Sequence, residues 1–159
     1  MKTTINVGSK TLELANNAFT PILYRQIFKK DFLALFSSMI TKNKDVINKA
    51  LKLQSVKAEF DEKKITREEF LQKYSEIGFD SGDLSIIDER ADLMSEIAFV
   101  MAKQAEIAEA SKLIQLTSLD YYNFLSQFDK NDLRSAAVVN ELIAFWQGNT
   151  VSKVEAKNI

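Results

Sequence analysis

The longest regular pattern of hydrophobic positions runs from Leu84 to Ala110, a stretch without glycine or proline. Apolar side chains recur there at alternating intervals of four and three residues, which places them on one helical face: Ile87, Ala91, Met94, Ala98, Met101, Ala105 and Ala108. Ile97–Ala102 is apolar on every side for more than one turn, as in a helix that is buried all round. The pattern predicts a central buried helix over about residues 85–110.

Strict alternation replaces helical spacing at the start of the chain. Hydrophobic and polar residues alternate over residues 4–7 and again over 11–14, with Gly8-Ser9 between the two runs. This pattern predicts a β-hairpin over 4–14 with a tight turn. Because a lone hairpin is marginally stable in water, its apolar face is expected to pack on helices.

Apolar spacing and cap residues predict five further helices, over about residues 21–40, 45–59, 66–77, 118–127 and 131–147. The first range fits one bent helix or two helices, the second of them capped by Asp31. Thr66 and Glu69 have the spacing of a capping box.

The fold class that follows is mainly α (α+β), with a short N-terminal β-hairpin and a bundle of about six helices around the central one. We expect one globular domain over 1–148 and a flexible polar tail over 149–159. Residues 41–83, where lysines and carboxylates are mixed, look like an inserted helical hairpin.

Composition narrows the function. The net charge of −1 gives no overall field toward nucleic acid or anionic lipid, and lysines of the middle region are offset by nearby acids. The N-terminus lacks the apolar core of a signal peptide, and no apolar run approaches the roughly 20 residues of a membrane span. We therefore expect a soluble, cytosolic protein that binds neither nucleic acid nor membrane.

Candidate chemistry is sparse. The chain has no His and no Cys, which removes imidazole bases, thiol nucleophiles and the commonest transition-metal ligands. No phosphate-binding glycine loop occurs, and the Phe79–Asp83 turn lacks the acidic ligands of a calcium loop.

The paired carboxylates fit solvated helix ends: Asp61/Glu62, Glu68/Glu69 and Asp88/Glu89. The aromatic cluster Tyr121, Tyr122 and Phe124 is expected to be buried rather than to stack on bases. The sequence thus predicts no enzyme, no catalytic residues, no cofactor and no metal.

Three segments in order resemble a known family: Ala18–Phe32 after the hairpin, Ile97–Ala105 in the central helix, and Phe124–Phe128 followed by Leu142–Gln147. Their order and spacing are similar to those of tail assembly chaperones of long-tailed, siphovirus-type phages and prophages of Gram-positive bacteria. The resemblance covers the two thirds of the chain that flank Thr41–Asp83, a region longer than the family leads one to expect.

The resemblance implies a non-enzymatic function. Such chaperones bind the tape measure protein, keep its helical length soluble, help to recruit tail tube subunits and are absent from the mature virion. The expected location is the host bacterial cytoplasm. The resemblance is compatible with a homo-oligomer as well as with a monomer. A longer form made by a −1 ribosomal frameshift would bring in the tail tube protein. Ala156-Lys157-Asn158 can be encoded GCA AAA AAC, which contains a slippery heptamer, although the tripeptide also suits any polar tail.

A chaperone for a helical client needs an apolar groove that is exposed in the isolated protein and covered in an oligomer or complex. The aromatic residues of the N-terminal helices and the last helix are the candidates for partner binding: Tyr24, Phe28, Phe32, Phe36, Phe145 and Trp146. The alternative function is a helical protein–protein interaction or adaptor module unrelated to phage.

Overall fold

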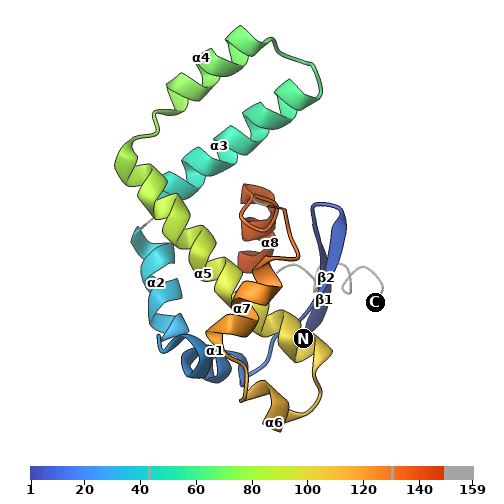
Figure 1. Ribbon diagram of the computed structural model, residues 1–159. Coiled ribbons are helices and arrows are strands. Elements are labelled where there is room, and N and C mark those ends of the chain that lie inside the picture. Colours follow the sequence, from blue (N-terminus) through green and yellow to red (C-terminus); the bar gives the residue numbers. More distant parts are fainter. Residues whose placement is uncertain (43, 130, 149–159) are drawn as a thin grey trace, which may run out of the picture. The chain divides into compact units, whose positions relative to one another are not determined.

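The computed structural model describes residues 1–42, 44–129 and 131–148. In these residues a two-stranded antiparallel sheet is followed by eight helices, which confirms the mainly α fold class with its N-terminal hairpin (Figure 1). Contacts divide the chain into two compact units, Ser37–Arg90 and Met1–Phe36 together with the described residues from Ala91 onward. A single domain over 1–148 stays a prediction. The expected tail 149–159, with Ala156–Asn158, lies outside the described residues.

The hairpin consists of β1, Lys2–Val7, and β2, Lys10–Ala15. Val7 pairs with Lys10 across the Gly8-Ser9 turn, and Gly8 has a φ of 62°, a conformation that glycine adopts without steric cost. The alternating apolar side chains face inward, and β1 packs on α8. The predicted hairpin is confirmed, and its apolar face is covered by a helix as expected.

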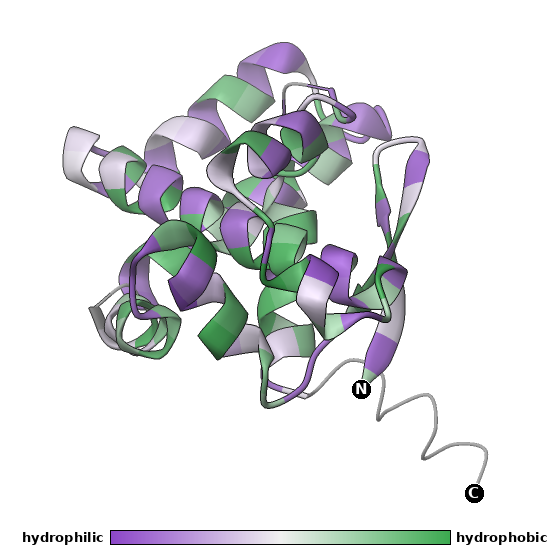
Figure 2. Cartoon of the chain, turned by 60° about the horizontal axis from the view of Figure 1, so that its bottom comes forward, coloured by the Kyte–Doolittle hydropathy of each residue, from purple (hydrophilic) through white to green (hydrophobic). Residues whose placement is uncertain are grey.

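The first unit contains α1, Thr20–Phe28, the first turn of α2, Phe32–Lys42, and the part of α5, Ser81–Glu106, that begins at Ala91. It also contains α6, Ala110–Leu113, α7, Ser118–Leu125, and α8, Ala136–Trp146. Figure 2 shows hydrophobic and polar stretches alternating along the helices, as amphipathic helices require.

The central helix is confirmed as a core element. Met94 and each of the residues Ile97–Met101 have an exposed fraction of 0 %. The all-round apolar stretch therefore lies inside the first unit, and helices and hairpin pack around it.

The structure decides between the two alternatives for one predicted range and differs from two other ranges in their bounds. The range 21–40 is two helices, because Lys29 takes a left-handed conformation, with a φ of 60°, and its N–H caps the carbonyl of Arg25 at 2.8 Å. The central helix begins at Ser81 rather than 85, because the Asp80 carboxylate accepts a hydrogen bond from the Asp83 N–H at 2.8 Å. It ends at Glu106, and α6 follows as a separate short helix. The last helix begins at Ala136 rather than 131, where the Ser135 hydroxyl accepts from the N–H of Val138 at 3.3 Å.

The second unit is built on the pair α3, Lys44–Asp61, and α4, Arg67–Ile77, which pack against each other. The Thr66–Glu69 capping box at the start of α4 is present, and Gly78 ends the helix with a φ of 75°. Val46 and Ala50 are buried in α3, and α4 buries no residue. The pair thus has a thin apolar seam. Across both units, no described helix has the length and apolarity needed to span a membrane.

Candidate functional site

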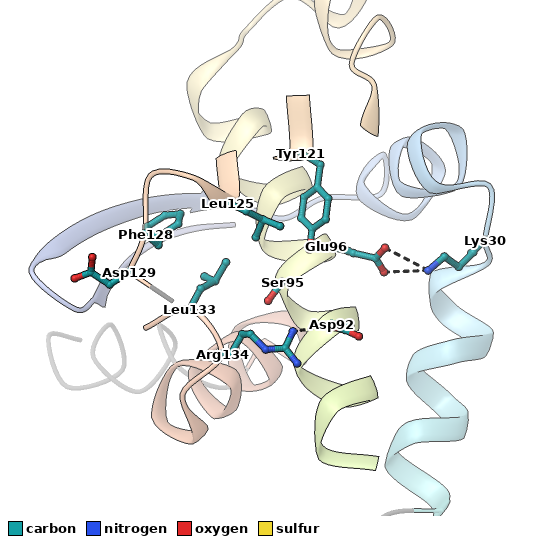
Figure 3. Close-up of a pocket in the computed structure, with 10 residues that line it drawn as sticks. All are labelled: Lys30, Asp92, Ser95, Glu96, Tyr121, Leu125, Phe128, Asp129, Leu133 and Arg134. Atoms are coloured by element: carbon teal, nitrogen blue, oxygen red, sulfur yellow. Dashed lines mark hydrogen bonds and ion pairs between the residues drawn. The ribbon is translucent and has the colours of Figure 1, made fainter. Parts of the chain in front are cut away.

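A cavity of about 390 Å³ lies beside α5 in the first unit. Its walls combine charged side chains with aromatic and aliphatic ones (Figure 3): Lys30, Asp92, Ser95, Glu96, Tyr121, Leu125, Phe128, Asp129, Leu133 and Arg134. Three of them, Asp92, Ser95 and Glu96, come from α5, where spacings of three and four residues place side chains on neighbouring faces. The buried central helix therefore presents polar groups to this cavity.

Glu96 has two polar partners at the cavity. Its Oε1 accepts a hydrogen bond from the Tyr24 hydroxyl at 2.9 Å, and its Oε2 lies 3.2 Å from the Lys30 ammonium. The side chain of Glu96 is 13 % exposed, whereas that of Lys30 is 51 % exposed. A largely buried carboxylate is therefore neutralised by a cation that stands mostly in solvent.

A second ion pair borders the cavity. Arg134, in the turn before α8, pairs with the carboxylate of Asp92. Together with Asp129, the cavity has three carboxylates against the two cations Lys30 and Arg134. Among the lining residues that the structure describes, carboxylates therefore exceed cations by one.

The opposite wall is aromatic. The Tyr121 ring lies 5.1 Å from that of Phe28 and 5.5 Å from that of Phe99. Phe124 and Phe128 continue the cluster, with ring centroids 5.1 Å apart. These edge and tilted contacts hold α7 against α1 and α5 and fix the position of the Tyr121 hydroxyl.

The pKa values of Tyr24 and Tyr121 are raised by burial and by the carboxylates of the cavity. Burial raises the pKa of the Tyr24 phenol well above its usual range, and the charge of Glu96 raises it further. Burial also raises the pKa of Tyr121, with Glu96 and Asp92 adding to the shift and Arg134 opposing it. Both phenols are therefore neutral hydrogen-bond donors at physiological pH.

Ser95 is the unusual residue of the site. It is 1 % exposed, and its Oγ is buried without a hydrogen-bond partner among the described residues. A helical serine often bonds a carbonyl one turn back, but Ser95 does not. In Figure 3 its hydroxyl leaves α5 on the side where Leu133 and Phe128 lie. The site thus contains an unsatisfied polar group at its inner wall.

The lining combines hydrogen-bonding groups with an apolar wall. The described residues contain no group of three or more side chains placed to hold a metal ion. The cavity offers hydroxyl groups, carboxylates and an apolar wall, which are the elements of a small-molecule or side-chain binding site.

A second feature of the first unit is a pair of exposed apolar side chains on α7, which we call the α7 surface and define by Leu119 and Tyr122. Leu119 and Tyr122, one turn apart on α7, are 66 % and 64 % exposed. Ile22 and Ile114 are 59 % and 47 % exposed. The Gln26 amide of α1 donates to the Ile114 carbonyl at 2.8 Å, so these segments lie side by side.

The six predicted partner-binding residues do not form this surface. Tyr24, Phe32 and Phe145 have an exposed fraction of 0 % and Phe36 of 9 %; Phe28 and Trp146 are half-buried. The Trp146 ring lies 4.5 Å from that of Phe32 and 6.1 Å from that of Phe36. The structure therefore gives these side chains a packing role, and their part in partner binding stays a prediction.

Sequence reasoning missed both features. The expectation that Tyr122 is buried is wrong, because α7 turns Phe124 inward and Leu119 and Tyr122 outward. The polar set Asp92, Ser95 and Glu96 could have been noticed, since its members have helical spacing and directly precede the apolar stretch Ile97–Ala102.

Comparisons of the chain with protein-family models, with curated proteins and with solved structures found no match.

Proposed function

We propose that the chain is a non-enzymatic chaperone of phage tail assembly, which binds the tape measure protein in the host cytoplasm and is absent from the finished virion. Two things support this proposal: the three segments that resemble such chaperones, and the α7 surface. The α7 surface carries most weight, because a chaperone for a helical client must expose apolar side chains before the client arrives.

The α7 surface suits a helix as its ligand. Leu119 and Tyr122 are separated by one helical turn and point away from Phe124, which anchors the same helix in the core. An amphipathic client helix docks through residues spaced by three and four positions. Tyr122 adds a rigid ring with a hydroxyl, the kind of side chain that is frequent at binding hot spots.

The finer partners belong to the same proposal. Recruitment of the tail tube protein requires the frameshifted longer form, and a homo-oligomer would cover part of the exposed apolar surface. Sequencing the gene tests the first point, because codons for Ala156–Asn158 that interrupt the run of A would remove the slip site.

Co-expression of the full chain with the candidate tape measure protein tests the function. We expect the chain to raise the soluble fraction of the client, and the double variant Leu119→Ser/Tyr122→Ser to lower that fraction by about threefold or more. Leu71→Ser is the matched control, because Leu71 is 53 % exposed on α4, outside the α7 surface.

Two outcomes would contradict the proposal. If the unaltered chain leaves the client insoluble, chaperone activity is refuted. If the double variant protects the client as well as the control does, the α7 surface is not the binding face. Circular dichroism of each variant shows that a loss of protection comes from the surface and not from unfolding.

A helical adaptor unrelated to phage would also use such a surface. The gene neighbourhood separates the two functions. A tape measure gene directly downstream and a tube gene upstream support the chaperone, and their absence supports the adaptor.

A further inference from the structure

We propose that the cavity beside α5 binds an organic cation, namely a primary ammonium or guanidinium group on an apolar stem. Two sources share this chemistry: a free aliphatic amine, or a lysine or arginine side chain of a bound partner. The second source rests on the proposed function, whereas the first does not.

The unsatisfied hydroxyl of Ser95 is the first observation. It is 1 % exposed, and its Oγ has no partner among the described residues. A buried polar group without a partner is unfavourable, so such groups in folded proteins are normally satisfied by protein, water or ligand. A cationic N–H donor in the cavity would give this oxygen the partner that the fold does not.

The charges of the lining are the second observation. Among the described residues of the lining, the carboxylates of Glu96, Asp92 and Asp129 outnumber the cations of Lys30 and Arg134. Glu96 is the more buried partner of its ion pair, and Lys30 is half in solvent. The Lys30 side chain is 51 % exposed, so its ammonium can move into water when an incoming ammonium takes its place on Glu96. An incoming anion would meet excess negative charge instead.

The walls explain why the cation should have an apolar stem. Leu125 and Leu133 line the cavity together with the rings of Tyr121 and Phe128. Aliphatic stems pack on such surfaces while the charged head reaches polar groups. The volume of about 390 Å³ lies within the range of small-ligand pockets.

Binding of pentylamine to the full chain, followed by NMR titration of the backbone amides, tests the proposal. We expect saturable shifts around Ser95 and Tyr121, with pentylamine binding about tenfold more tightly than the neutral isostere pentanol. Pentanoate is expected not to bind. Equal binding of amine and alcohol, tighter binding of pentanoate, or no saturable shift with the amine would overturn the proposal.

Variants give the sharpest test. Lys30→Met removes the resident cation from Glu96 and should tighten pentylamine binding by about threefold. Lys29→Met changes the net charge equally, but Lys29 does not line the cavity, so its binding should equal that of the wild type. Equal tightening in both variants, or weaker binding in Lys30→Met, would contradict a cation site at Glu96.

The role of Ser95 has its own control. Ser95→Ala should weaken pentylamine binding by about threefold, because the ammonium loses one acceptor. Ser111→Ala removes an exposed hydroxyl outside the cavity and should leave binding unchanged. Unchanged binding in Ser95→Ala would mean that ordered water, and not the ligand, satisfies this hydroxyl, and would overturn its assignment.

A helical peptide with one central lysine, compared with its norleucine analogue, distinguishes the two sources. If the lysine peptide binds about tenfold more tightly than pentylamine and loses this advantage with norleucine, the cation belongs to a partner side chain. If only the free amine binds, the ligand is a small molecule, and the chaperone proposal is unaffected. If neither binds, the cation site is refuted while the client-solubility test still stands.

Discussion

The hydroxyl of Tyr24 donates a hydrogen bond to the carboxylate of Glu96 at 2.9 Å, across 72 positions of the sequence. The phenol ring projects from α1 and is fully buried, and the carboxylate that it contacts lines the polar cavity. One residue thus joins the aromatic core of the first unit to its candidate binding site.

Removing this hydrogen bond should destabilise the protein without leaving a cavity in the core. Tyr24→Phe keeps the ring and deletes the hydroxyl, and hydrogen bonds to charged groups contribute about 1.5–3 kcal/mol. We expect the free energy of unfolding, measured by urea titration, to fall by about 1–2 kcal/mol, because Lys30 continues to neutralise Glu96. Tyr122→Phe is the matched control: its side chain is 64 % exposed, and the change should be within about 0.5 kcal/mol. Equal effects of both variants would show that the Tyr24 hydroxyl contributes nothing.

The same phenol predicts an alkaline dependence of stability. The pKa of Tyr24 is raised in the folded state, first by burial and then by Glu96, while an unfolded tyrosine has a pKa near 10. The unfolded chain therefore releases this proton first. The contribution of the Tyr24 phenol to the free energy of unfolding is therefore fully present below pH 10, and it is lost as the pH rises above 10.

Unfolding titrations at pH 10 and pH 11 measure the effect. The wild type should lose about 1 kcal/mol more over this interval than Tyr24→Phe, because one linked proton is missing in the variant. Phe124→Leu, a core variant that keeps all the phenols, should show the wild-type loss. A Tyr24→Phe protein that loses stability as steeply as the wild type would contradict the raised pKa.

The hairpin turn makes a close approach that glycine permits. A Cβ placed on Gly8 would lie 2.7 Å from Cγ of Asp132, and the φ of 62° is itself unfavourable for other residues. Gly8→Ala should therefore lower the free energy of unfolding by about 2–3 kcal/mol.

Gly78→Ala isolates the backbone part of this cost. Gly78 has a φ of 75° with open space around its Cα, so its replacement should cost about 1–2 kcal/mol. Asp132→Ala in the Gly8→Ala background should recover most of the difference between the two single variants. If Gly8→Ala and Gly78→Ala are equally destabilising, the contact with Asp132 does not matter.

How far the sequence predicts the fold depends on whether a local pattern decides the outcome. The alternation around Gly8 predicts only a hairpin, and the all-round apolar run from Ile97 to Ala102 predicts only a buried helix. Both elements are present. Near Lys29 the pattern allows two outcomes, because Asp31 can cap a second helix in a stretch that also fits one bent helix. A lysine is not expected in the left-handed conformation that Lys29 takes at the end of α1, so the sequence does not show that the first helix ends there.

The candidate site was harder to predict for the same reason. The short α7 carries apolar residues on opposite faces, and the sequence does not say that Phe124 turns inward while Leu119 and Tyr122 turn outward. Likewise, the roles of Ser95 and Glu96 depend on which side chains reach them from distant segments. Helical spacing places both residues on α5, but it does not predict that Tyr24 and Lys30 contact Glu96.

Phe99 joins the central helix to the aromatic wall of the cavity, and its truncation should affect both stability and the site. The ring is fully buried, with its centroid 5.5 Å from those of both Tyr121 and Phe124. Phe99→Ala should lower the free energy of unfolding by about 3–5 kcal/mol, because the lost packing leaves a cavity. Leu84→Ala on the same helix is the control: Leu84 is 51 % exposed, and its truncation should cost about 0.5 kcal/mol or less.

The milder Phe99→Leu keeps most of the apolar volume, so it should remain folded while the Tyr121 ring loses an aromatic neighbour. We expect its near-ultraviolet circular dichroism, which reports on fixed aromatic side chains, to weaken relative to wild type. An unchanged aromatic signal, or a Phe99→Ala protein as stable as Leu84→Ala, would contradict a structural role for this ring.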